Sequence, residues 1–446
     1  MFSGLESFIL SKLSEYKMPS LAISIVKGRD VVYANAFGFR DVERGLPASP
    51  STVYGIGSIT KSFTALAVLK LVEEGRLSLD DYVEKYVPLK IRPMGEAIRI
   101  RHLLTHTSGI PALGYAEAFL EGLLGVGDSW EPAAKPQDVL YLVNDAGEWA
   151  FEKPGRRFFY LNEGYVLLGA VVEKASGVSY WDYVKKNILK PLGMSRTYLK
   201  AEEVEKDNDV AKPYLLDPQS KRLAPARIPF GIGSDGGILS NVLDMAKYVA
   251  MLINRGSLGD VYILDRRLLE EAESKHVDIP WKLIGDEGYG YGLIISENFF
   301  GKKLVGHGGN VLVYTAYMAY LPQEEVGVTV LANSMGYPMS YIAAYALALA
   351  LGKDPRQLPF LAREGVIKKL EGVYRGYKGH VSYEVKAKGD VLIARSRLGE
   401  ELYLLPDEIR EDYAKFYTYM RGYKIPVEFY IGEKVKMVLE RYLLVK

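Results

Sequence analysis

The sequence predicts an α+β protein in which a mixed sheet is packed with helices and a small antiparallel β-barrel or sandwich follows. In the first 350 residues, strand patterns lie near both ends and helical patterns lie in the middle, so the sheet must take strands from both ends. A polar stretch with two prolines, 352–359, then reads as a linker, after which short alternating strands begin. We therefore predict a first domain over 1–355, a linker over 356–366 and a small antiparallel barrel or sandwich over 367–446.

Helical spacing over 3–16 precedes two β-rich runs, 21–26 and 31–37, which predict a hairpin around a glycine-containing turn. The clearest helix is 58–74, which has an apolar majority and ends before Gly75. Further helices are expected at 162–176, 180–189, 241–254 and 340–351, and strands at 312–321 and 326–332. In the barrel, strands are expected at 381–387, 391–394, 427–431 and 435–439.

Composition narrows the function classes. The chain has 446 residues and a net charge of +1, so no global field favours nucleic acid or acidic membranes. The absence of cysteine excludes disulfides, thiolate nucleophiles and cysteine-ligated metals. Charged residues interrupt any signal-like apolar run near the start, and no run reaches the roughly 18 apolar residues of a membrane span. We expect a cytoplasmic protein, and its 33 tyrosines without any cysteine favour a thermophilic source.

A Ser-x-x-Lys motif, Ser58 to Lys61, opens the clearest helix. Positions i and i+3 share a helix face, so the lysine can reach the hydroxyl and help remove its proton. A helix start also supplies backbone N–H groups that can stabilise an oxyanion. The same spacing occurs at Ser14 and Ser24, but the first lies at a helix end and the second in a strand. The alternative for Ser58 is a simple N-cap.

Two further motifs carry polar groups. Tyr160-Leu-Asn162 precedes a helix, and a phenol beside a lysine can act as a base while the amide holds a substrate carbonyl. The alternative is a buried tyrosine followed by an asparagine N-cap. Gly306-His-Gly-Gly-Asn310 contains glycines that let a ligand approach the backbone, and His307 offers a hydrogen-bond donor. The alternative is a turn with a surface histidine.

Together these motifs resemble the serine β-lactamase and penicillin-binding protein superfamily, whose motifs Ser-x-x-Lys, Tyr-x-Asn and Lys-Thr-Gly or His-x-Gly occur in this order. The resemblance covers most of residues 5–350 and is similar to the branch of class C β-lactamases, D-alanyl-D-alanine carboxypeptidases and D-aminopeptidases. The matching stretches are 58–65, 75–81, 100–111, 160–165, 191–194, 236–240 and 288–293. It implies an antiparallel sheet with helices on both faces and an all-helical region.

The resemblance implies that Ser58 forms the acyl-enzyme, that Lys61 and Tyr160 move protons, and that Asn162 binds the substrate amide. It implies no metal and no cofactor.

On the facing strand, the resemblance implies that Gly308 and Gly309 contact the substrate. The backbone N–H of Asn310 would join that of Ser58 in an oxyanion hole. His307 stands where β-lactamases and carboxypeptidases usually have lysine, so a substrate carboxylate is favoured less. His-Gly-Gly resembles the D-aminopeptidase and esterase members.

The pair His102-x-x-x-His106 has zinc-ligand spacing, but Thr105-His-Thr-Ser-Gly109 resembles a structural turn of the superfamily. We therefore predict no metal site there.

The added barrel resembles the lipocalin-like domain of D-aminopeptidases and of archaeal peptidases whose catalytic units form a closed, cube-like homo-oligomer. We therefore expect a serine peptidase or aminopeptidase that acts on short peptides, with D-amino acids among the candidate substrates, and a homo-oligomer with a cube-like octamer as its candidate form. Three alternatives remain open. They are an esterase or amidase for small substrates, a penicilloyl-type sensor that is acylated without turnover, and a lipid-binding module centred on the barrel.

Overall fold

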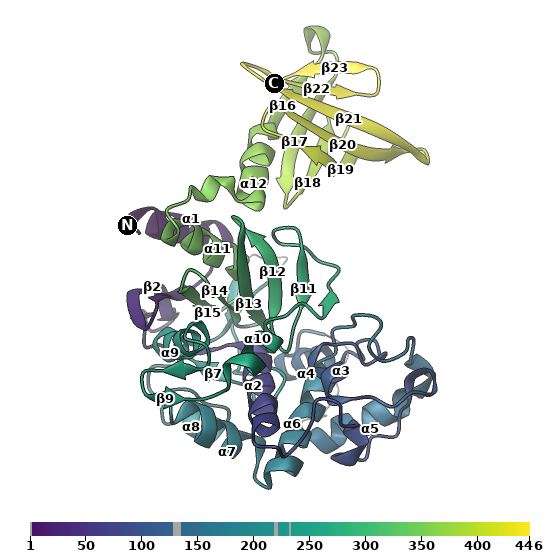
Figure 1. The fold of residues 1–446 in the computed structure, drawn as a ribbon. Helices are drawn as coiled ribbons and strands as arrows, with labels where there is room; N and C mark the ends of the chain where they lie inside the picture. The colour runs from purple at the N-terminus through teal and green to yellow at the C-terminus, as the bar shows by residue number, and fades with distance from the viewer. Residues whose placement is uncertain (1, 128–134, 218–221, 232) are drawn as a thin grey trace. The chain divides into compact units, whose positions relative to one another are not determined.

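The computed structural model shows two compact units, which divide after Gly352 (Figure 1). The sequence places the end of the first domain three residues later, at 355. The structure describes residues 2–127, 135–217, 222–231 and 233–446.

The first unit is built on a nine-stranded sheet in which every pair of neighbouring strands is antiparallel. Its central strands pair the two ends of the unit, since Ile23 of β1 lies opposite Val330 of β15. The predicted sheet with strands from both ends is therefore confirmed. In spatial order the strands are β10 (Val277–Asp278), β11 (Glu287–Tyr289), β12 (Ile294–Phe299), β13 (Lys302–Asn310), β14 (Thr315–Leu321), β15 (Val326–Ala332), β1 (Ser20–Lys27), β2 (Asp30–Asp41) and β3 (Leu46–Pro47).

Three short two-stranded sheets accompany the large sheet. They are formed by β4 (Tyr54–Gly55) with β7 (Leu239–Ser240), β5 (Tyr214–Leu216) with β6 (Leu223–Pro225), and β8 (Ser257–Leu258) with β9 (Val261–Tyr262).

Helices cover the large sheet and form a separate helical region. Figure 1 shows α1 and α11 on one side of the sheet and α9 on the other, while α3 to α6 gather beyond α2. Eleven residues of α2 are buried, which fits its apolar composition. The helices of this unit are α1 (Ser3–Tyr16), α2 (Thr60–Glu73), α3 (Ile100–Leu104), α4 (Tyr115–Leu124), α5 (Pro136–Asp145), α6 (Asn162–Ser176), α7 (Tyr180–Val184), α8 (Ala201–Val204), α9 (Val242–Ile253), α10 (Arg266–Ala272) and α11 (Met339–Ala350).

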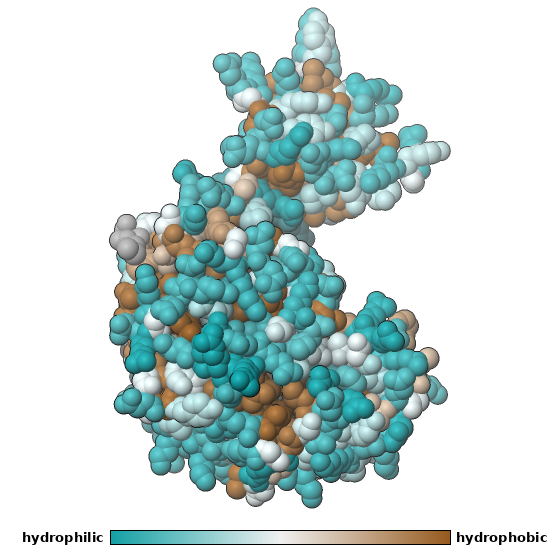
Figure 2. Space-filling model, viewed as in Figure 1, coloured by the Kyte–Doolittle hydropathy of each residue, from teal (hydrophilic) through white to brown (hydrophobic). Residues whose placement is uncertain are grey.

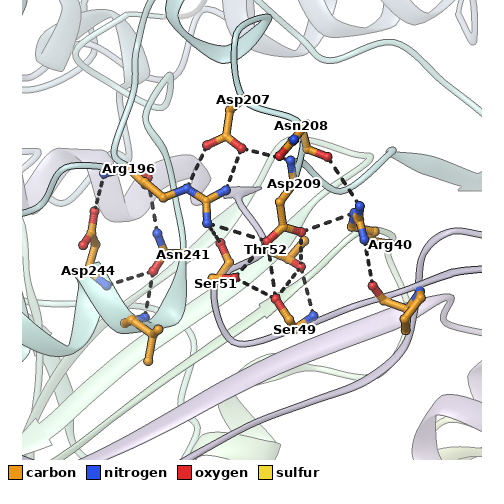
Figure 3. Close-up of polar contacts among 12 residues, drawn as sticks. Arg40, Ser49, Ser51, Thr52, Arg196, Asp207, Asn208, Asp209, Asn241 and Asp244 are labelled. Carbon is orange, nitrogen blue, oxygen red and sulfur yellow. Dashed lines mark hydrogen bonds and ion pairs between the residues drawn. The ribbon is translucent and has the colours of Figure 1, made fainter.

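A polar network fixes the chain that leads into the Ser58 turn (Figure 3). The Arg196 guanidinium donates two hydrogen bonds to the Asp207 carboxylate, at 2.9 and 2.6 Å, and a third to the carbonyl of Ser51 at 2.8 Å. The Ser51 hydroxyl donates to Asp209 at 2.9 Å. A bidentate arginine–carboxylate pair restrains direction as well as distance. Residues 196–209 therefore hold the segment before Ser58 in place.

The second unit is a closed barrel of eight antiparallel strands whose interior is filled by its own side chains. Phe416, Phe429 and Leu404 are each 0% exposed, as expected when eight strands leave only enough room for side chains. A barrel packed in this way leaves no support for the lipid-binding alternative. The strands are β16 (Gly372–Arg375), β17 (Ser382–Lys388), β18 (Val391–Ser396), β19 (Glu401–Ile409), β20 (Tyr413–Met420), β21 (Tyr423–Ile431), β22 (Val435–Leu439) and β23 (Tyr442–Val445).

The stretch 356–366, which the sequence presents as a linker, is largely helical. Helix α12 spans Pro359–Leu370 and has its proline in the first turn. Proline is tolerated there because the first N–H groups of a helix need no intrahelical acceptor. Pro359 therefore marks the start of a helix and not a break between domains.

On the face shown in Figure 2, hydrophilic side chains dominate the surface of each unit and hydrophobic ones form small separate groups. Within the described part of the chain, no helix is long and apolar enough to cross a bilayer.

Candidate active site

Ser58 lies in a 3-10 turn, Gly57–Ile59, that runs directly into helix α2. The turn touches strand β13 backbone to backbone. A Cβ on Gly57 would lie 2.6 Å from the nitrogen of Asn310, and a Cβ on Gly309 would lie 1.9 Å from the carbonyl oxygen of Ile56. Only glycine permits this approach, so the two glycines bring the Ser58 hydroxyl beside the strand.

Lys61 sits one turn along and is 0% exposed. Its ammonium nitrogen donates to Ser58 Oγ at 2.9 Å, to Asn162 Oδ1 at 2.8 Å and to the main-chain carbonyl of Asp235 at 2.8 Å. The amide and the carbonyl can only accept hydrogen bonds, whereas a serine hydroxyl can donate or accept. A neutral Lys61 would therefore keep two N–H donors on the fixed acceptors and turn its lone pair to Ser58. A proton can move between Ser58 and Lys61 without rearranging the site.

Asp235 was not singled out from the sequence, because it acts through its backbone. Its buried carboxyl accepts hydrogen bonds from the Tyr115 hydroxyl at 2.8 Å and from the N–H of Gly233 at 3.2 Å. These contacts fix the peptide whose carbonyl meets Lys61. The following Gly236 opens one of the stretches that carried the family resemblance, which was the only signal of this loop.

Tyr160 directly precedes the Leu161–Asn162 start of helix α6, and its ring centre lies 4.9 Å from the Lys61 nitrogen. The ring also packs at 4.2 Å from the ring of His106. The phenol is thus placed next to the ammonium that contacts Ser58. The predicted proximity of Ser58, Lys61, Tyr160 and Asn162 is present in the structure.

His307 differs from its description in the sequence analysis in two respects. Its motif lies within strand β13 and not in a turn, and the ring is not at the surface, since it is only 3% exposed. Its Nδ1 is 2.6 Å from the carbonyl of Gly308, and its Nε2 is 2.8 Å from the hydroxyl of Tyr289. Because Nδ1 must donate to a carbonyl, Nε2 accepts from the phenol, and no ring donor is left for a substrate.

Burial, reinforced by the nearby Lys61 ammonium, lowers the pKa of His307 to about 3. The imidazole is therefore neutral at physiological pH. The expectation that His307 offers the substrate a hydrogen-bond donor is therefore wrong, and the cause is the burial of the ring, which a single motif does not reveal.

Strand β13 also presents an open backbone edge toward the site. Strand β12 pairs with it only as far as Gly306, opposite Ile294. From His307 to Asn310, strand β13 keeps its pairing with β14 on the other side. Within the described residues, this stretch has no strand partner on the β12 side. Its backbone groups can therefore meet an extended substrate.

These groups line one cavity of about 690 Å³, a volume typical of small-molecule and peptide sites. The predicted substrate-binding residues Asn162, Gly308, Gly309 and Asn310 all line it, as do Ser58, Tyr160 and His307. Lys61 lies directly behind Ser58.

The charged side chains that line the cavity are all acidic among the described residues. Glu117 and Glu121, one turn apart on α4, lie on its wall, and Asp235 and Glu287 also line it. No lysine or arginine is present among the described lining residues. The segment between β10 and β11 is apolar where it borders the cavity, with Trp281, Leu283 and Ile284 at the cavity surface. The cavity therefore favours a cationic or neutral ligand over an anionic one.

The two histidines with zinc-ligand spacing do not share a helix, since α3 ends at Leu104. The Nδ1 of His102 accepts the N–H of Arg99, and the Nδ1 of His106 accepts the N–H of Leu161. Each ring thus accepts a hydrogen bond from a main-chain N–H through its Nδ1.

Comparison with known proteins places this architecture in a family. Residues 5–353 match the family described as Beta-lactamase, and residues 355–445 match the Pab87 octamerisation domain. The chain is 28% identical over 332 residues to Protein flp of Staphylococcus aureus, covering 74% of this chain and 62% of that protein's length.

Two solved structures are similar. The octameric penicillin-binding protein homologue from Pyrococcus abyssi is 55% identical, with a TM-score of 0.94 and 99% of each chain covered. A D-stereospecific amidohydrolase from Streptomyces is 25% identical, with a TM-score of 0.63, covering 78% of this chain and 98% of that one. The chain therefore belongs to the beta-lactamase and penicillin-binding protein superfamily of serine hydrolases, and it carries the Pab87-type octamerisation domain after its beta-lactamase unit.

Proposed function

We propose that this protein is a serine hydrolase that forms an acyl-enzyme on Ser58 and acts as an aminopeptidase on short peptides. The observation that carries the proposal is the set of three contacts around the Lys61 nitrogen, which leaves Ser58 as its one exchangeable partner. A serine is a weak nucleophile until a neighbouring base takes its proton.

In the proposed reaction, the Ser58 oxygen attacks the substrate carbonyl as its proton passes to Lys61. The N–H groups of Ser58 and Asn310 stabilise the oxyanion, and Asn162 holds the substrate amide. The proton then reaches the leaving amine through Tyr160, and the C–N bond breaks. Water attacks the ester, gives its proton to the same pair and releases Ser58.

The charge of the cavity supports an amino-terminal preference. A free peptide amino group is cationic, and Glu117 and Glu121 line the same cavity as the nucleophile Ser58. A terminal carboxylate would meet acidic residues and a neutral His307. This favours an aminopeptidase over a carboxypeptidase. The likeness to a D-stereospecific amidohydrolase supports D-amino acid residues as substrates.

Both the octamerisation domain and the octameric relative support assembly of eight chains of 49.8 kDa, about 398 kDa. We propose that this octamer is the active form of the protein, which agrees with the cube-like octamer expected from the sequence. Light scattering after size-exclusion chromatography measures this mass, and a stable monomer or dimer would contradict it.

The test of the activity compares p-nitroanilides of D- and L-amino acids that have a free or an acetylated amino group. We expect the free amine to have a kcat/KM at least about 10-fold higher, the scale of one charge-assisted hydrogen bond. Glu117→Gln with Glu121→Gln should reduce this ratio. Equal rates for both forms would refute the amino-terminal preference and favour the esterase or amidase alternative. A single burst without steady-state turnover would favour the sensor.

A further inference from the structure

His106 is a buried histidine that the proposed reaction does not use. It is 1% exposed and lies in the loop between α3 and α4 with a φ of 56°. Positive φ is uncommon outside glycine, although histidine and asparagine adopt it more readily than most residues. A residue held in this conformation inside a protein needs a compensating role.

The loop around His106 holds the chain that leads to Tyr160. The carbonyl of Gly109 accepts the N–H of Phe151 at 3.0 Å, and the carbonyl of Thr107 accepts the N–H of Gly155 at 2.7 Å. These contacts make the Thr-His-Thr-Ser-Gly loop a backbone support for residues 151–161.

His106 itself binds both neighbours of Tyr160. Its carbonyl oxygen accepts the N–H of Phe159 at 2.8 Å, and its Nδ1 accepts the N–H of Leu161 at 3.0 Å. One residue thereby restrains the backbone on either side of the tyrosine. The imidazole ring also packs 4.2 Å from the phenol ring, centre to centre. A single residue from another part of the sequence therefore contacts the backbone on both sides of Tyr160 and one face of its surroundings, beside the rings of Phe158, Trp281 and Tyr289.

The protonation of His106 fits this function. Its Nδ1 must be unprotonated to accept an N–H, so a neutral ring carries its proton on Nε2. Burial, with the positive charge of Lys61, lowers the pKa of His106 well below 6.5 and keeps the ring neutral. Among the described residues, Nε2 has no hydrogen-bond partner, and the ring is surrounded by Tyr160, Tyr165 and Tyr289. The hydrogen bond from the N–H of Leu161 to Nδ1 is therefore the one that fixes the ring's tautomer.

We propose that His106 is a positioning residue that fixes the phenol of Tyr160 beside Lys61, an inference that rests on the proposed proton-transfer function of Tyr160. Asparagine can replace it in part, because Asn tolerates the left-handed conformation and its side-chain oxygen can occupy the place of Nδ1. Glutamine is longer, and its amide reaches toward the position of Nε2 instead. Alanine removes the acceptor and the ring.

The first measurement is the rate at which the full-length protein reacts with a fluorescent alkyl fluorophosphonate. We expect His106→Ala to lower the limiting rate by about 100-fold, the cost of a misplacement of about 1 Å, while the half-saturating probe concentration changes less than about 3-fold. His106→Asn should recover most of the rate, and His106→Gln should not. In the Tyr160→Phe background, His106→Ala should lower the rate by less than about 3-fold, because the group that it positions is absent.

The second measurement is hydrogen exchange of the peptide that spans 157–163, read by mass spectrometry. We expect His106→Ala to expose one amide, that of Leu161, and His106→Asn to restore its protection. This readout does not depend on activity.

The outcomes separate the two proposals. Unlabelled wild-type protein, or full labelling of Tyr160→Phe, would overturn the proposed reaction, and hydrogen exchange would still decide whether His106 holds the Tyr160 segment. Wild-type labelling of His106→Ala, an equal loss in both backgrounds, or unchanged exchange would overturn the positioning inference. If His106→Ala does not fold, equal rates for the Asn and Gln variants would overturn it.

Discussion

The contact between the Ser58 turn and strand β13 gives a prediction that depends on geometry alone. Gly309→Ala adds one methyl group that would lie 1.9 Å from the carbonyl oxygen of Ile56, where ordinary contact begins at 3.4 Å. The turn and the strand must then separate by about 1.5 Å, the difference of these distances. Displacements of about 1 Å in a reacting geometry cost about 100-fold in rate. We expect the limiting rate of fluorophosphonate labelling to fall by at least that factor.

Gly308→Ala is the matched control on the neighbouring residue. Its Cβ would lie 3.4 Å from the Tyr317 ring, which is ordinary contact, and neither glycine has a positive φ that would strain alanine. We expect a change of less than about 10-fold, since no backbone must move. Circular dichroism and thermal melts check that both variants fold. Labelling of Gly309→Ala at the wild-type rate would refute the argument that backbone contact sets the position of Ser58.

Three further predictions follow from the same structure. Lys61→Ala and Tyr160→Phe should each lower the rate by at least about 100-fold, and the double variant should lose less than the product of the two factors; full multiplicative losses would show independent action. Because folding lowers the pKa of His307, the neutral ring contributes fully to the free energy of unfolding above pH 6.5, and this contribution is lost as pH falls toward 3. Between pH 7 and pH 5, urea unfolding should show a loss of unfolding free energy that is about 2 kcal/mol smaller in His307→Gln than in the wild type. Equal losses in the two proteins would contradict a buried neutral ring. A fragment ending at Gly352 should fold and keep Ser58 reactive but remain monomeric, and an insoluble fragment or an intact octamer would count against two separable units.

Much of the fold could be predicted because its elements have strong periodic patterns. Helices α1 and α6 and strand β15 begin and end where the sequence places them. Strand β13 was missed because Gly306, Gly308 and Gly309 weaken any strand pattern. Their packing explains them, since a Cβ on Gly306 would lie 2.4 Å from a neighbouring carbonyl. When a neighbouring strand leaves no room for a side chain, the resulting glycine gives no periodic pattern in the sequence.

The candidate site was predictable where side chains carry the chemistry and not where the backbone or burial does. Ser58, Lys61 and Tyr160 belong to motifs with known spacing. Asp235 contributes a carbonyl, which any residue could supply. His106 was taken only as part of a turn, because its partners lie more than 50 residues away.

In the proposed reaction, Ser58 carries the acyl group during turnover. Rapid acid quench of the protein with a D-alanyl p-nitrophenyl ester, followed by peptide mass spectrometry, tests it directly. We predict a mass increase of one alanyl group on the peptide that contains Ser58, formed before steady state and absent from Ser58→Ala. Turnover without this adduct, or the adduct on another residue, would contradict the assignment of Ser58 as the acylated nucleophile.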